Sequence, residues 1–146
     1  MLGRLFGASK KTEPVAAIKH ADFGELVWDN ENKHWRAEAE YRGRQIPIYI
    51  PGKPPDYVSD KACRKLLQVV RAPKMTLDTA TDFLIAQLSK ESRRVVSEEE
   101  LQLEDVIIFA ESEDGFHVCF QWRDQPDWLL RVFFKDGVPV NWAFDD

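Results

Sequence analysis

The chain has 146 residues, of which 44% are hydrophobic and 31% charged, and it contains nine Phe, five Trp and three Tyr. This balance is typical of one folded globular domain and excludes an intrinsically disordered chain. Two cysteines allow at most one disulfide, and no apolar stretch of about 18 residues occurs, so a disulfide framework and a membrane-spanning helix are also excluded. We expect a reduced, cytoplasmic setting without a secretory signal.

The first structured unit is expected to be a three-stranded antiparallel meander, which follows a flexible tail at residues 1–19. Residues 23–28 have the composition of a strand. Residues 34–41 alternate between apolar and charged side chains, which is typical of a half-buried strand. Residues 46–50 form the third expected strand, with isoleucines inward. Pro47 cannot donate a hydrogen bond, so this strand is expected at an edge or with that position facing solvent.

The middle of the chain predicts two to three helices. Apolar residues recur at helical spacing over about 60–71, and Ser59 or Asp60 can cap the amino end of this helix. Pro73 is expected to end it, and a second helix then follows from Thr76. A serine with a glutamate three residues later, at 97–100, is a capping box that predicts a short third helix.

The carboxyl-terminal part predicts a four-stranded antiparallel meander. Its strands are expected at 106–110, 116–122, 128–134 and 138–144, separated by turns rich in Asp and Gly. The side chains expected to point inward from the last strand are Val138, Val140, Trp142 and Phe144. The expected fold is therefore a single α+β domain over 20–146, with helices packed over antiparallel meanders.

His117 and Cys119 raise the question of a metal pair or an activated thiol. A zinc site needs three or four converging ligands, and the remaining candidates are His20, His34 and Cys63, which lie far away in the sequence. Side chains two apart on a strand stand roughly parallel, so the imidazole is poorly placed to activate the thiol. We interpret the pair as part of a partly covered strand face. We expect neither a metal, nor a cofactor, nor a catalytic constellation.

The most unusual feature is the charge of the last third of the chain. Residues 96–146 carry thirteen Asp and Glu but only three Lys and Arg. Acidic turns beside tryptophans can steer and dock a basic protein partner. The alternative is that these turns are polar for solubility and that the tryptophans are core. The expected partner-binding residues are Glu111, Glu113, Trp122, Asp124, Asp127 and Trp128.

The segment F-G-E-L-V-W-D at 23–29, with W-R-A-E-A-E-Y-R-G-R-Q-I-P-I-Y-I at 35–50, resembles a set of small bacterial domains of unknown function. Those domains open with F-G-x-[LI]-x-[WY]-D, and some are proposed to be immunity proteins that neutralise toxins. The resemblance implies a non-enzymatic, protein-binding domain and brings no catalytic residues. An enzyme with a pocket between helices and sheet, and a homodimer formed through an exposed strand, remain alternatives. The acidic composition disfavours nucleic acid as a partner.

Overall fold

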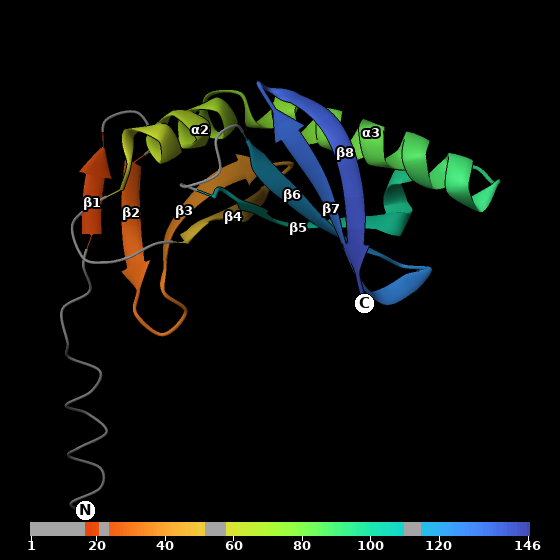
Figure 1. Ribbon diagram of the computed structural model, residues 1–146, viewed down its shortest axis with the longest axis horizontal. Coiled ribbons are helices and arrows are strands. Elements are labelled where there is room, and N and C mark those ends of the chain that lie inside the picture. The colour runs from red at the N-terminus through yellow and green to blue at the C-terminus, as the bar shows by residue number, and fades with distance from the viewer. Residues whose placement is uncertain (1–16, 21–23, 52–57, 110–114) are drawn as a thin grey trace, which may run out of the picture.

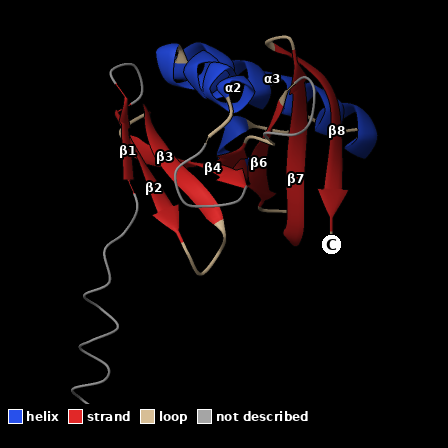
Figure 2. Cartoon of the chain, turned by 60° about the vertical axis from the view of Figure 1, so that its left-hand side comes forward, coloured by secondary structure: helices blue, strands red, loops and turns tan. Residues whose placement is uncertain are grey.

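The computed structural model describes residues 17–20, 24–51, 58–109 and 115–146. They form one eight-stranded sheet in which each strand neighbours the next in the sequence, and the two helices lie along one face of that sheet (Figures 1 and 2). Residues 1–16 of the expected tail, together with Glu111 and Glu113, lie outside the described residues.

The strands are β1 (Ala17–His20), β2 (Gly24–Asp29), β3 (His34–Tyr41), β4 (Arg44–Pro51), β5 (Leu101–Ile107), β6 (Phe116–Trp122), β7 (Gln125–Lys135) and β8 (Val138–Asp145). The helices are α2 (Asp60–Arg71), α3 (Pro73–Ser92) and the single 3₁₀ turn η1 (Glu98–Glu100). The capping box expected at 97–100 is present in η1. The Ser59 side chain caps α2 by accepting a hydrogen bond from the backbone of Ala62.

The expected division into a three-stranded and a four-stranded meander is wrong, because the sheet is continuous and mixed. α2 and α3 form a crossover between β4 and β5, and a crossover of this length allows the two strands to run parallel. Ile48 pairs with Val106, and Tyr49 pairs with Ile107. In addition, β1 pairs antiparallel with β2. It begins at Ala17, inside the range expected to be tail.

The core lies between the helices and the sheet face that they cover. Trp35, Ile46 and Ile48 from the sheet are almost fully buried, as are Leu66 and Leu84 from the helices. The alternation over 34–41 places its apolar residues on this face, as expected. Burying such side chains contributes roughly 1.5–3 kcal/mol for each large one, so this layer is the main source of stability.

The prediction for the last strand is wrong in its burial. Val138 is 56% exposed, Val140 is 54% exposed and Phe144 is 46% exposed. β8 is one of the two edge strands, and in the described part of the chain no strand pairs with its outer edge. Its register with β7 also shifts, since Phe133 pairs with Asn141 whereas Phe134 pairs with Pro139. The irregularity inserts Val140 as an extra residue and breaks the simple alternation.

Pro47 limits the pairing between β4 and β5. The backbone of Tyr49 faces β5, because its carbonyl accepts a hydrogen bond from the Ile108 N–H at 2.8 Å. Backbone groups alternate in direction along a strand, so Pro47, two residues earlier, also faces β5 and has no N–H to donate. Pairing is confined to Ile48 and Tyr49, and the amino-terminal halves of the two strands are unpaired with each other.

Candidate functional site

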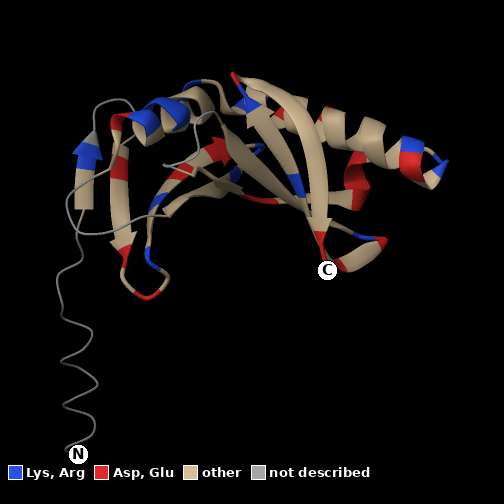
Figure 3. Cartoon of the chain, viewed as in Figure 1, with Lys and Arg blue, Asp and Glu red and all other residues tan. Residues whose placement is uncertain are grey.

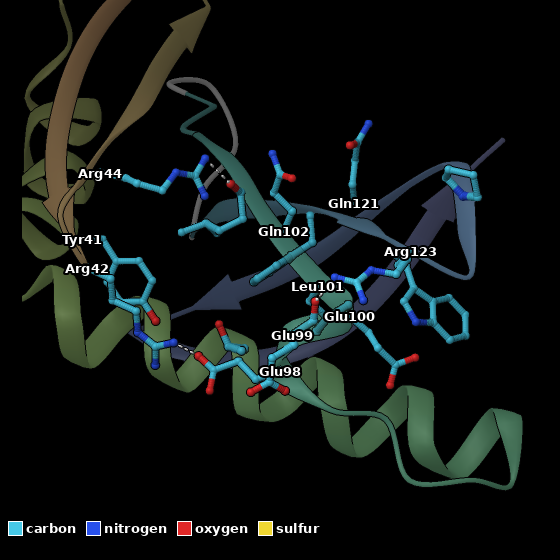
Figure 4. A pocket seen from close by; sticks show the side chains of 15 residues that line it. Tyr41, Arg42, Arg44, Glu98, Glu99, Glu100, Leu101, Gln102, Gln121 and Arg123 are labelled. Carbon is cyan, nitrogen blue, oxygen red and sulfur yellow. Dashed lines mark hydrogen bonds and ion pairs between the residues drawn. The ribbon is translucent and has the colours of Figure 1, made fainter.

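A groove of about 820 Å³ opens beside the unpaired halves of β4 and β5 (Figure 4). It is lined from the end of β3, the start of β4, η1, β5, the end of β6 and α3. The lining includes Tyr41, Arg42, Arg44, Glu98, Glu99, Glu100, Gln102, Gln121, Trp122 and Arg123. Charged and amide side chains thus lie beside apolar ones such as Leu101, Leu103 and Phe120.

The wall formed by β3 and α3 is an internally satisfied ion cluster. The Tyr41 hydroxyl donates to Asp78 at 2.5 Å, and Arg42 donates to the same carboxylate oxygen at 2.9 Å. Arg42 also forms an ion pair with Glu98. Burial and the hydrogen bond to Asp78 raise the pKa of Tyr41 to about 12. The hydrogen bonds from Tyr41 and Lys74 lower the pKa of Asp78. This wall stabilises the fold, and its carboxylates Asp78 and Glu98 are both engaged by Arg42.

Two arginines tie the floor of the groove to backbone carbonyls. Arg44 reaches across from β4 and donates to the Leu103 carbonyl at 3.2 Å, and Arg123 donates to the Glu99 carbonyl at 3.1 Å. Neither guanidinium has an ion-pair partner among the described residues. Gln102 and Gln121 are cross-strand partners, and their exposed amides point to the same side in Figure 4.

Beside the groove, an arginine is held by two carboxylates and an indole, which we call the arginine cage: Glu100, Trp122 and Asp124 around Arg94. Of these four residues, Glu100 and Trp122 line the groove. The Arg94 guanidinium donates to both oxygens of Glu100, at 2.6 and 3.2 Å, and to Asp124 at 2.6 Å. It lies 5.8 Å from the Trp122 ring centre. The Arg94 hydrogen bond and the Ser97 backbone lower the pKa of Glu100 to about 2. The pKa of Arg94 is raised by its hydrogen bonds to Glu100 and Asp124.

An aromatic row continues outward from the cage across β6, β7 and β8. The ring centres of Trp122 and Trp128 are 6.5 Å apart, and Trp128 stacks on Phe144 at 4.1 Å with an interplanar angle of 12°. Trp142 is 6.4 Å from Phe144. Phe144 was missed as a site residue because the sequence pattern assigned it to the core.

The predicted partner-binding residues thus come together in part. Trp122 and Trp128 share the aromatic row, and Asp124 lies beside them, but Asp124 is already paired with Arg94. Asp127 is exposed and has no ion pair among the described residues. Glu111 and Glu113 lie outside the described residues, so the structure does not place them.

The chain neutralises part of its own acidic third. Ten of the thirteen carboxylates at 96–146 are described, and four of these form ion pairs with arginines of the same chain. The four paired carboxylates are Glu98, Glu100, Asp124 and Asp145. Figure 3 shows acidic segments at η1, at the turn between β6 and β7 and at the carboxyl terminus. Among the other six described carboxylates of 96–146, Glu99, Asp127 and Asp146 carry no ion pair in the described chain.

His117 and Cys119 lie on the sheet face opposite the helices, as the sequence predicts. Cys119 is fully buried, and burial and the nearby Asp105 strongly raise the pKa of its thiol. Burial lowers the pKa of His117 to about 4, and Arg131 adds to this effect. The imidazole packs between Phe109 and Phe133, at 4.9 and 4.3 Å. A neutral thiol beside a neutral imidazole is not an activated nucleophile. The described part of the chain contains no group of three residues that could hold a metal ion.

The described groove lining contains none of the residue types that form Ser–His or Cys–His catalytic pairs. Its residues include no Ser, Cys or His, and the Thr81 hydroxyl donates to the Leu77 carbonyl of its own helix at 2.8 Å. The groups of the described lining that could act as a base or a nucleophile are therefore carboxylates, namely Glu98, Glu99 and Glu100. Among the described helices, none has both the length and the apolar character needed to cross a membrane. Comparisons with protein-family models, with curated proteins and with solved structures find no match to the chain.

Proposed function

We propose that this chain is a non-enzymatic, cytoplasmic protein-binding domain of the immunity-inhibitor type, which binds a basic segment of a partner protein. The binding surface is its acidic–aromatic end, defined as Glu99, Asp127, Trp128, Phe144 and Asp146. The single observation that carries the proposal is the stacked pair of Trp128 and Phe144. Phe144 is 46% exposed on the edge strand, and Asp127 and Asp146, which carry no ion pair in the described chain, lie within two residues of Trp128 and Phe144 in the sequence.

The aromatic rings and the carboxylates of this surface contribute differently to the binding of a basic segment. Exposed ion pairs contribute only about 0–1 kcal/mol each, so the carboxylates act mainly by steering a basic partner and selecting its charge. Covering the remaining exposed part of an aromatic side chain contributes roughly 1 kcal/mol, and aromatic residues are favoured anchors in interfaces. The combination supports binding of a basic segment that also has side chains able to lie on aromatic rings.

The backbone edge of β8 is a less suitable docking element than its side chains. Pro139 lies within the strand and the register shifts beside it. Both features are devices by which proteins prevent strands of other chains from pairing at an edge. This supports docking through the rings and carboxylates, rather than the homodimer formed by pairing of exposed strands.

Titration with a hexa-arginine peptide tests the proposal, with calorimetry and tryptophan fluorescence as readouts. We expect a Kd on the order of 10–100 μM at low salt, which weakens as salt rises because exposed charges are screened. A variant with Glu99→Gln and Asp127→Asn is expected to bind at least threefold more weakly, and Phe144→Ser likewise. The charge control is Asp60→Asn, because Asp60 is an exposed carboxylate at the start of α2.

The control variant should bind as the unmodified protein does. The proposal is overturned if hexa-arginine does not bind at low salt, or if a hexaglutamate peptide binds equally well. It is also overturned if the acidic–aromatic variants retain full affinity.

A further inference from the structure

We infer that Arg94 occupies, within the chain itself, the position that an arginine of the partner takes in the complex, and that this position selects arginine over lysine. The inference rests on the proposed function. It specifies the partner's chemistry more closely, because it requires a guanidinium rather than any positive charge.

The arginine cage has the geometry that guanidinium recognition needs. Glu100 receives two hydrogen bonds from Arg94, and Asp124 receives a third at 2.6 Å from the same terminal nitrogen that makes the shorter bond to Glu100. The planar guanidinium presents its N–H groups as a rigid fork and can also lie against an aromatic ring, as it does against Trp122. A lysine ammonium is a single point charge and cannot reproduce the two-oxygen contact with Glu100.

The cage also opens onto the place where a partner would dock. Glu100 and Trp122 both line the groove, and Trp122 begins the aromatic row that leads to Trp128 and Phe144. The Trp122 side chain is only 7% exposed, so its ring is held in place beside the guanidinium position.

Arg94 is held in a way that permits exchange. Its side chain is 40% exposed and that of Asp124 is 54% exposed, and an ion pair at this exposure is weak because water competes for both partners. Arg94 lies between Arg93, which ends α3 in the left-handed conformation, and Val95, which is 87% exposed. The next buried anchor is Val96, whose N–H donates to Ser89 at 3.0 Å. Only residues 93–95 would have to shift for the guanidinium to leave.

Removing the internal arginine should therefore vacate the cage for an external one. We expect Arg94→Ala to bind hexa-arginine at least fivefold more tightly than the unmodified protein, while its affinity for hexalysine changes less than twofold. Lys90→Ala is the matched control, because Lys90 is an exposed cation in the last turn of α3. The control should shift both affinities by less than twofold, which separates cage occupancy from general charge. Combining Arg94→Ala with Asp124→Asn should cancel the gain.

The outcomes distinguish this inference from the proposed function. If the unmodified protein binds hexa-arginine but Arg94→Ala binds no more tightly than Lys90→Ala, the inference is wrong and the proposed function stands. An equal gain for hexa-arginine and hexalysine also overturns it. If neither the unmodified protein nor the variant binds hexa-arginine, both fail. Thermal unfolding checks that the variants fold, and Arg94→Gln replaces the alanine variant if the alanine variant does not.

Discussion

Replacing Tyr41 with Phe probes the ion cluster that closes one wall of the groove. The Tyr41 side chain is 7% exposed, and its hydroxyl donates to Asp78 at 2.5 Å. Asp78 keeps Arg42 and Lys74 as partners in the variant, both at 2.9 Å. A hydrogen bond to a charged group contributes about 1.5–3 kcal/mol, and the remaining partners reduce the loss. At pH 8 we expect Tyr41→Phe to lower the free energy of unfolding by about 1–2 kcal/mol.

The hydrogen bond between Tyr41 and Asp78 also predicts how the difference in unfolding free energy between the unmodified protein and Tyr41→Phe changes at high pH. The pKa of Tyr41 is about 12 in the fold against 10.0 for an ordinary tyrosine. The raised pKa means that the fold favours the protonated phenol. This stabilisation is complete below pH 10 and is lost as the pH rises towards 12. At pH 11 the shift corresponds to a loss of at most about 1.4 kcal/mol, and about 1 kcal/mol after screening by solvent. The phenylalanine variant cannot lose it.

Denaturant unfolding of both proteins at pH 8 and pH 11 measures this directly. Lysines titrate in the same range, but they are common to both proteins and cancel in the comparison. We expect the stability difference between the unmodified protein and Tyr41→Phe to be smaller at pH 11 by about 1 kcal/mol. An equal difference at the two pH values would refute the assignment of the perturbed phenol to Tyr41. It would also mean that the contact with Asp78 is absent in solution.

Three further predictions concern the rest of the sheet. In a Cys63→Ser variant the only remaining thiol is the fully buried Cys119, whose pKa is raised, so Ellman's reagent should detect no thiol in the native protein and one after denaturation. His117 has a pKa of about 4 in the fold against 6.5 otherwise, so stability should fall by about 1–2 kcal/mol between pH 7 and pH 5, and His117→Phe should flatten this dependence in denaturant unfolding. Gly115→Ala should cost about 3 kcal/mol or more in thermal unfolding, because the added Cβ would lie 1.8 Å from the Phe134 carbonyl oxygen. Gly137→Ala, where φ is +80° and no atom lies within 4 Å of the added Cβ, should cost only about 1 kcal/mol.

Short sequence patterns predicted those helices and strands that are determined by neighbouring residues in the chain. The alternation over 34–41 recurs in the structure with the same bounds, and the cap at Ser59 is present. The helix predicted over about 60–71 ends at Arg71, before Pro73, as expected. The second helix was expected to begin at Thr76, but α3 begins at Pro73, where the missing N–H of proline is not needed.

Pairing between distant segments could not be predicted in this way. β1 has only four residues and no periodicity, and it exists because β2 offers it an edge. A strand was expected at 106–110, but β5 already begins at Leu101, so Glu104 and Asp105 lie within it, at an irregularity in its pairing with β6. The join between β4 and β5 likewise depends on how α2 and α3 return the chain, which no short pattern encodes.

The candidate site shows the same division between local and distant causes. Trp122 and Trp128 were named from the sequence as partner-binding residues beside one proline turn, and the structure places their ring centres 6.5 Å apart. The partner of Asp124 could not be inferred, since Arg94 lies thirty positions earlier in the sequence. The exposure of Phe144 could not be inferred either, because it depends on β8 being the last strand of the described sheet.

Charge assigned to a segment of sequence therefore differs from charge presented by a surface. Arg42 and Arg94, which both precede residues 96–146, neutralise part of the negative charge of that segment. Arg42 pairs with Glu98, and Arg94 pairs with both Glu100 and Asp124. An acidic surface without such internal partners would attract basic proteins of many kinds. A surface on which one guanidinium position is already filled binds only a partner that can replace Arg94 or use the unpaired carboxylates. The internal arginine would thus lower the affinity for unsuitable cations while keeping the cage in the geometry that a partner's arginine requires.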